Sequence, residues 1–78
     1  MKYIYACLAG EWKCLNNDPN CVMGKNFQEP SQWLREGAPI ETVTNKTGET
    51  YHEMDYVMIH FEGVDYHINP IFIQVVTK

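Results

Sequence analysis

The stretch that decides the fold is Tyr56-Val57-Met58-Ile59-His60-Phe61-Glu62-Gly63-Val64-Asp65-Tyr66-His67-Ile68-Asn69. Apolar and polar residues alternate on both sides of Glu62-Gly63, which is typical of a β-hairpin with a two-residue turn. Such a turn pairs Phe61 with Val64, Ile59 with Tyr66 and Val57 with Ile68. All six apolar side chains then point to one side, whereas a three-residue turn would move Phe61 out of that set. The alternation therefore predicts both the hairpin and its register, although glutamate is uncommon at a turn position that needs positive φ.

The same register places a polar set on the other face of the hairpin. Tyr56, Met58 and His60 lie opposite Asn69, His67 and Asp65, and His67 is also the diagonal neighbour of His60. Two imidazoles and a carboxylate are a ligand set for a divalent metal, or a proton-sensitive patch. The simpler interpretation is a solvated sheet face with one favourable charge pair. We predict no cofactor and no bound metal, and keep His60, Asp65 and His67 as an alternative metal site.

The flanking sequence predicts further short strands and one short helix. Ala9-Gly10-Glu11 is turn chemistry that fits either a two- or a three-residue loop, and Asn69-Pro70 ends the central hairpin. The expected strands are 3–8, 12–15, 40–44, 50–55 leading into the hairpin, and 71–77, with a turn at 45–48, a helix at 31–36 after Pro30, and long loops within 16–32. Five or six antiparallel strands in a single domain, 1–78, predict an all-β fold with one short helix, closed into a small barrel.

The second half of the chain resembles a known family. The string Gly37-Ala38-Pro39-Ile40-Glu41-Thr42-Val43, then Tyr56 to Pro70, then Ile73 to Val76, is similar to SH3-like small barrels, in particular the short ones of bacteria and their phages. The resemblance covers residues 37–77 and implies a strand, a loop, a hairpin, a brief turn and a closing strand. The segment Asn16 to Gln32 departs from it. The acidic-aromatic loop of peptide-binding SH3 domains is absent, so recognition of proline-rich peptides does not carry over.

Charge is unevenly distributed along the chain. The net charge is −4, and no Lys or Arg lies between Glu49 and Asp65, a stretch with five acidic residues. Direct binding to a phosphate backbone needs clustered cations, so we expect no nucleic-acid binding. An acidic surface is complementary instead to a basic protein surface.

The cysteine spacing and the hydropathy pattern argue against a zinc protein, a secreted protein and a membrane protein. Cys7, Cys14 and Cys21 are too widely spaced for zinc knuckles, and small buried thiols are the expected use. The chain reaches Gly10-Glu11 too soon for a signal peptide and has no apolar run of membrane-spanning length, so we expect a cytoplasmic protein without membrane contact. Nothing supplies an oxyanion loop or a nucleophile elbow, and a small barrel has no room for a substrate pocket. We therefore expect no enzymatic activity.

These expectations combine into one functional interpretation. We expect the chain to be a small acidic module that binds another protein. By analogy, we expect it to be an inhibitor or modulator that is encoded by a phage or mobile element and that occludes a host protein. A metal- or ligand-sensing barrel and a structural subunit of a larger particle are the alternatives, and self-association stays open. Aromatic residues such as Tyr3, Tyr5, Trp12 and Tyr51 favour a binding surface. The predicted partner-binding residues are Tyr56, Met58, His60, Asp65, His67, Glu53 and Asp55.

Overall fold

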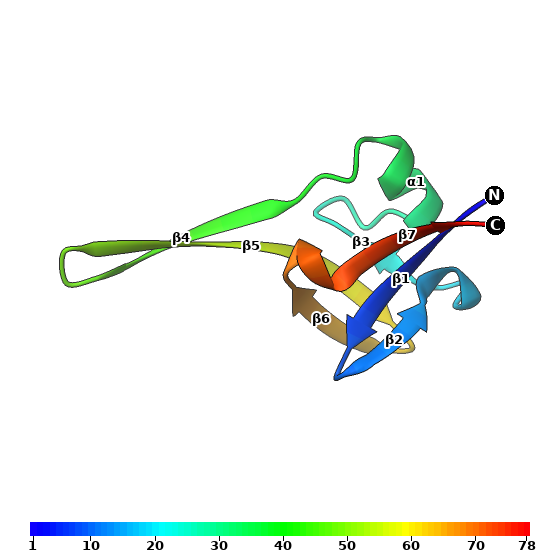
Figure 1. The fold of residues 1–78 in the computed structure, drawn as a ribbon, viewed down its shortest axis with the longest axis horizontal. Helices are drawn as coiled ribbons and strands as arrows, with labels where there is room; N and C mark the ends of the chain where they lie inside the picture. The colour runs from blue at the N-terminus through cyan, green and yellow to red at the C-terminus, as the bar shows by residue number, and fades with distance from the viewer.

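Two antiparallel sheets pack across a shared core in the computed structural model of the chain (Figure 1). The structure describes the backbone of residues 1–78, and every side chain except those of Asn45, Thr47 and His52. One sheet has the strand order β2-β1-β7; in the other, β5 pairs with β3, β4 and β6. The elements are β1 (Lys2–Leu8), β2 (Glu11–Cys14), the 3-10 turn η1 (Leu15–Asn17), β3 (Val22–Met23), α1 (Pro30–Arg35), β4 (Glu41–Thr47), β5 (Thr50–Phe61), β6 (Val64–Ile68), the 3-10 turn η2 (Pro70–Phe72) and β7 (Ile73–Thr77).

The all-β class with one short helix and a small barrel-like arrangement is confirmed. The described chain has seven strands rather than five or six, because β3 forms inside the segment predicted as loop. Its two residues pair with His60 and Ile59 of β5, and Met23 is buried in the core. A strand this short carries too little alternation to be recognised in a sequence. The helix is confirmed to within one residue at each end.

The central hairpin has the predicted register. Phe61 pairs with Val64, Ile59 with Tyr66 and Val57 with Ile68. Glu62 and Gly63 both have positive φ, 50° and 80°, as a tight two-residue turn requires. The three β5 side chains are buried, but Val64 is 49% exposed, so one of the six side chains expected on the inward side lies outside the core. The turn end of β6 extends past the core.

The first hairpin has a two-residue turn, which resolves the alternative that the sequence left open. Leu8 pairs with Glu11, and Ala9 and Gly10 adopt φ of 51° and 85°. This register buries Ile4, Ala6 and Leu8 and turns the alternate side chains of β1 away from the core. β7 pairs with the other edge of β1, and the two chain ends lie side by side (Figure 1).

The largest departure from the predicted arrangement is a projecting arm. The turn predicted at 45–48 lies instead at Gly48-Glu49, since Thr47 pairs with Thr50. β5 is one continuous strand of twelve residues, whose second half lies in the body and whose first half pairs only with β4. The β4–β5 ribbon therefore extends from the body as a two-stranded arm (Figure 1), which accounts for the long dimension of a molecule measuring 46 × 25 × 20 Å.

The closing segment also begins later than predicted. Ile71 and Phe72 belong to η2 and not to a strand, because Pro70 starts the turn and the Asn69 side chain accepts a hydrogen bond from the Ile71 N–H at 3.0 Å. β7 follows from Ile73. Within the described residues, no helix is long and apolar enough to cross a membrane.

Candidate functional site

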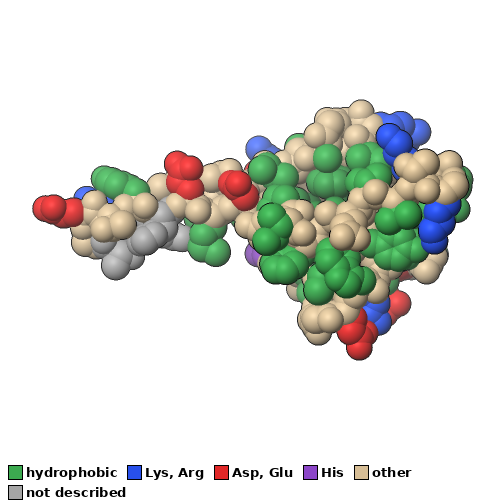
Figure 2. Space-filling view, viewed as in Figure 1, with side chains coloured by type: hydrophobic (Ala, Val, Ile, Leu, Met, Phe, Trp, Pro, Cys, Tyr) green, Lys and Arg blue, Asp and Glu red, His purple; other side chains and the backbone are tan. Residues whose placement is uncertain are grey.

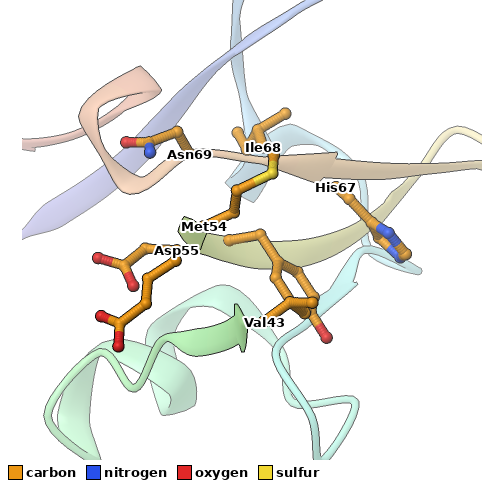
Figure 3. A pocket seen from close by; sticks show the side chains of 8 residues that line it. Val43, Met54, Asp55, His67, Ile68 and Asn69 are labelled. Atoms are coloured by element: carbon orange, nitrogen blue, oxygen red, sulfur yellow. The ribbon is translucent and has the colours of Figure 1, made fainter. Parts of the chain in front are cut away.

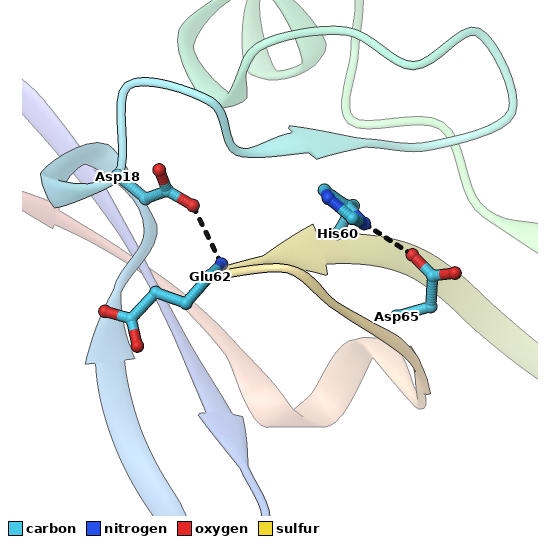
Figure 4. A network of polar contacts seen from close by, with 4 residues as sticks. All are labelled: Asp18, His60, Glu62 and Asp65. Atoms are coloured by element: carbon cyan, nitrogen blue, oxygen red, sulfur yellow. Dashed lines mark hydrogen bonds and ion pairs between the residues drawn. The ribbon is translucent and has the colours of Figure 1, made fainter.

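The polar face of the central hairpin contains one close cross-strand pair of polar side chains. His60 lies directly opposite Asp65, and its Nδ1 is 2.6 Å from the Asp65 Oδ1 (Figure 4). The His60 side chain is partly exposed (41%) and that of Asp65 is exposed (73%). Screening by water makes such a pair a small contributor to stability. The cross-strand pair predicted from the register is therefore present, on a partly exposed face.

Asp18 ties the turn of this hairpin to the loop after η1 (Figure 4). Its carboxylate accepts the Glu62 N–H at 2.8 Å and the Asn20 N–H at 3.0 Å. These two hydrogen bonds to the charged form hold the pKa of Asp18 below its usual value of 3.8. The contact fixes the turn to the body, so the hairpin face has a defined orientation.

His67 does not join His60 and Asp65. Its ring lies 5.3 Å from the Tyr56 ring, tilted by 37°, so it packs against the diagonal neighbour on the side away from His60. Among the described residues, no three His, Cys, Asp or Glu side chains lie close enough together to hold a metal. The structure thus brings His60 and Asp65 together and places His67 beside Tyr56, toward the base of the arm.

A cavity of about 590 Å³ opens where the arm leaves the body (Figure 3). β6 ends there at Ile68, which Asn69 follows, while β5 continues into the arm. Figure 3 shows Met54 and Ile68 near its middle, Asp55 and Asn69 to one side and His67 to the other. We call this cavity and its rim the arm-base surface. It is lined by Val43, Glu53, Met54, Asp55, Tyr56, His67, Ile68 and Asn69.

The apolar part of the arm-base surface was missed by sequence reasoning. Val43 and Met54 are a cross-strand pair on the same face as Tyr56, and they are 40% and 61% exposed. With the turn predicted at 45–48, the register between the two strands that form the arm could not be predicted. A two-residue turn at Gly48-Glu49 would have paired these two residues directly.

The predicted partner-binding residues are divided by the structure. Tyr56, His67, Glu53 and Asp55 line the arm-base surface. Met58, His60 and Asp65 lie farther along the hairpin, with Met58 opposite His67. Tyr56, Met58 and His60 are half-buried rather than fully exposed. The outward face therefore exists, but its hollow part lies toward the arm.

Acidic side chains accompany the apolar pair along the arm (Figure 2). Glu53 and Asp55 project from the face opposite Met54, because neighbouring residues of a strand point to opposite sides. Asp55 Oδ1 accepts a hydrogen bond from the Thr42 hydroxyl at 2.8 Å. Nearer the tip, the Lys46 ammonium lies 5.3 Å from the centre of the Tyr51 ring. One face of the arm therefore carries the exposed apolar pair Val43 and Met54, and the other carries the contacts of Thr42 with Asp55 and of Lys46 with Tyr51.

A second aromatic surface lies on the three-stranded sheet. The outward residues of β1 and β2 include Tyr3, Tyr5, Cys7 and Trp12, with Cys7 opposite Trp12. Lys78 packs against Tyr3 and Tyr5 on this surface. Its ammonium lies within 5.6 Å of both ring centres and 3.1 Å from the Tyr5 hydroxyl. This surface is therefore partly covered by Lys78.

The cysteines act as packing residues where they are buried. Cys21 is in the core, and burial raises the pKa of its thiol to about 12, so it stays protonated and unreactive. Cys7 and Cys14 are half-buried and free. The expectation of small buried thiols thus holds fully for Cys21 only.

Comparison of the chain with protein-family models, with curated protein sequences and with solved structures finds no match in any of the three.

Proposed function

We propose that this chain is a small acidic protein-binding module that acts by sterically occluding its partner, and that the arm-base surface is its main contact. The observation that carries the proposal is the cavity of about 590 Å³ next to the exposed pair Val43 and Met54. An apolar hollow with an aromatic wall is the type of site into which a partner's anchoring side chain packs.

The partner expected from this chemistry has a basic surface with an apolar side chain at its centre. Glu53 and Asp55 lie at the rim of the cavity, and the stretch from Glu49 to Asp65 contains no Lys or Arg. Rim charges of one sign mainly increase the rate of encounter with a surface of opposite sign. A basic surface that otherwise holds nucleic acid fits this description, and covering it would inhibit that protein. An inhibitor of a host protein, working in the cytoplasm, is the form of the proposal that we favour.

The test compares three immobilised chains: wild type, Val43→Ser/Met54→Ser, and Trp12→Ser on the three-stranded sheet. Proteins captured from lysate of the source cells are identified by mass spectrometry, and the affinity of the purified partner is then measured. We expect wild type and Trp12→Ser to bind equally, and the double variant to bind at least about tenfold more weakly. Equal binding by all three chains, or a loss with Trp12→Ser alone, would place the contact elsewhere.

Salt provides an independent readout of the same complex. Binding by wild type should weaken steadily between about 0.05 and about 0.5 M salt, because exposed charges are screened at these ionic strengths. Affinity that does not change with salt would contradict the role of Glu53 and Asp55, and would indicate a purely apolar contact.

A further inference from the structure

The hydrogen-bonding pattern of β5 leaves part of one edge without a neighbour. Residues that flank a two-residue turn form a hydrogen-bonded pair, and this pairing recurs at every second residue. Thr50 is paired in this way with Thr47, so the even residues of the arm direct their N–H and C=O groups toward β4. Phe61 is paired with Val64, so the odd residues of the body direct theirs toward β6.

β6 ends before it covers all of the odd residues. Its last pair joins Ile68 to Val57. The next odd residue of β5, Asp55, would face Pro70, which has no N–H and begins η2. In the part of the chain that the structure describes, no strand pairs with Tyr51, Glu53 or Asp55 on this side. The backbone groups of these three residues therefore face an open position in line with β6.

We propose that an extended basic segment of the partner adds to β5 at this position as a further antiparallel strand, with lysine or arginine at alternate residues and an apolar residue between them. The inference rests on the proposed function, and specifies how the partner is held. Main-chain hydrogen bonds supply affinity in this type of binding, and alternating side chains supply specificity.

The alternation follows from the two faces of the arm. Residues of the added strand opposite Asp55 and Glu53 point to the same face as these carboxylates, where a cation is favoured. The residue between them points to the face of Met54, beside the cavity lined by Tyr56 and His67. A basic-apolar-basic sequence therefore satisfies both faces.

A second copy of the chain fits this edge poorly. Two β5 strands joined in an antiparallel manner around Glu53 would place Glu53 against Glu53, and like charges directly opposite one another destabilise a strand pair. The acidic edge therefore favours a different, cationic chain. The arm also gains from a third strand, because a two-stranded ribbon is only marginally stable by itself.

The experiment uses the intact chain and a synthetic peptide, acetyl-Ser-Lys-Val-Lys-Val-Lys-Ser-amide. Amide exchange and chemical shifts are followed by NMR. We expect the peptide to bind, and the amides of Tyr51, Glu53 and Asp55 to exchange several-fold more slowly in its presence. A peptide of identical composition with its lysines in one block should bind more weakly. Failure of the alternating peptide to bind would overturn strand addition, whereas a partner captured by the arm-base surface would still support the proposed function.

Methylation of the peptide backbone separates strand addition from simple charge attraction. Methyl groups on the lysine nitrogens of the main chain remove the N–H groups that face β5, and should abolish binding. Methyl groups on the valine nitrogens face away, and should be tolerated. Equal binding by both methylated peptides would overturn the proposal, since only charge would then hold the peptide.

The contribution of the acidic pair is tested on the protein side. Glu53→Gln/Asp55→Asn should weaken peptide binding several-fold, whereas the charge-matched control Glu11→Gln/Glu29→Gln should leave it unchanged. An equal loss in both double variants would show that net charge, and not this edge, attracts the peptide.

Discussion

At the scale of single residues, two turns hold side chains in a conformation that they rarely adopt. Ala9 and Glu62 have φ of 51° and 50°, in the left-handed region that glycine, asparagine and aspartate tolerate best. Each is the first residue of a two-residue hairpin turn, followed by a glycine. The sequence signalled the turn at Glu62-Gly63 because the alternation around it is long. The short flanks of the first turn could not distinguish a two-residue from a three-residue loop.

Replacing Ala9 by asparagine should stabilise the protein. Asn-Gly is the favoured pair for this type of turn, and Ala9 is exposed, so the larger side chain can point into solvent. We expect Ala9→Asn to raise the free energy of unfolding by about 0.5–1 kcal/mol, and the melting temperature by several degrees. Gly10→Ala, at φ of 85°, is the matched control and should lower both. A melting temperature unchanged by both substitutions would contradict the turn geometry.

Asp18 should make stability fall in acid. Its folded pKa is lowered by hydrogen bonds from the Glu62 and Asn20 backbone, so it lies below the unfolded value of 3.8. Stability from this group is therefore fully present above about pH 4, and is lost as the pH falls through the folded pKa. Urea unfolding of wild type and Asp18→Asn between about pH 2 and 7 tests this. The variant should be less stable at neutral pH and should lose less on acidification, and parallel curves would show that Asp18 contributes nothing.

At the scale of elements, the packing of β3 against α1 depends on the close approach of Gly24 to Trp33. Gly24, directly after β3, has φ of 78°, and a methyl group there would lie 2.9 Å from Cδ1 of Trp33. Trp33 is also held by a hydrogen bond from its Nε1 to the Pro39 carbonyl at 3.0 Å. The indole therefore has little freedom to move, and the loop passes over it only because residue 24 has no side chain.

Gly24→Ala should cost about 2 kcal/mol or more in unfolding free energy, from overpacking added to backbone strain. Gly48→Ala is the matched control, because Gly48 also has positive φ (62°) but has no atom within 4 Å of the added methyl group. It should cost only about 1 kcal/mol. Equal losses in denaturant unfolding would mean that strain alone acts, and that Trp33 yields to the methyl group.

How much of these elements the sequence predicts depends on the length of their patterns. Strands of five or more alternating residues were predicted, and so was the helix bounded by Pro30 and Gly37. β3 was missed because two residues have no period. The arm was missed because Asn45-Lys46-Thr47-Gly48 begins and ends with strong turn formers, which hid the two-residue turn at Gly48-Glu49. With that turn misplaced, the pair Val43 and Met54 could not be predicted.

At the scale of the whole molecule, a single strand serves two roles. The second half of β5 buries Val57, Ile59 and Phe61 at the centre of the body. The first half carries Met54 and the acidic residues Glu53 and Asp55 out along the arm, beside the cavity where β6 ends. A rigid core thus holds an open strand edge at a fixed place, which is the property that a docking module needs.

Amide hydrogen exchange in the free chain tests this division of β5 directly. Amides of Val57, Ile59 and Phe61 should exchange slowest, since they are paired with β6 and buried. Within the arm, Met54 and Tyr56 should be protected by their bonds to β4, and Glu53 and Asp55 should exchange several-fold faster. Equal protection of all four arm amides would contradict the account, because it would mean that the edge beyond β6 is already covered. Free exchange of all four would show that the arm does not form.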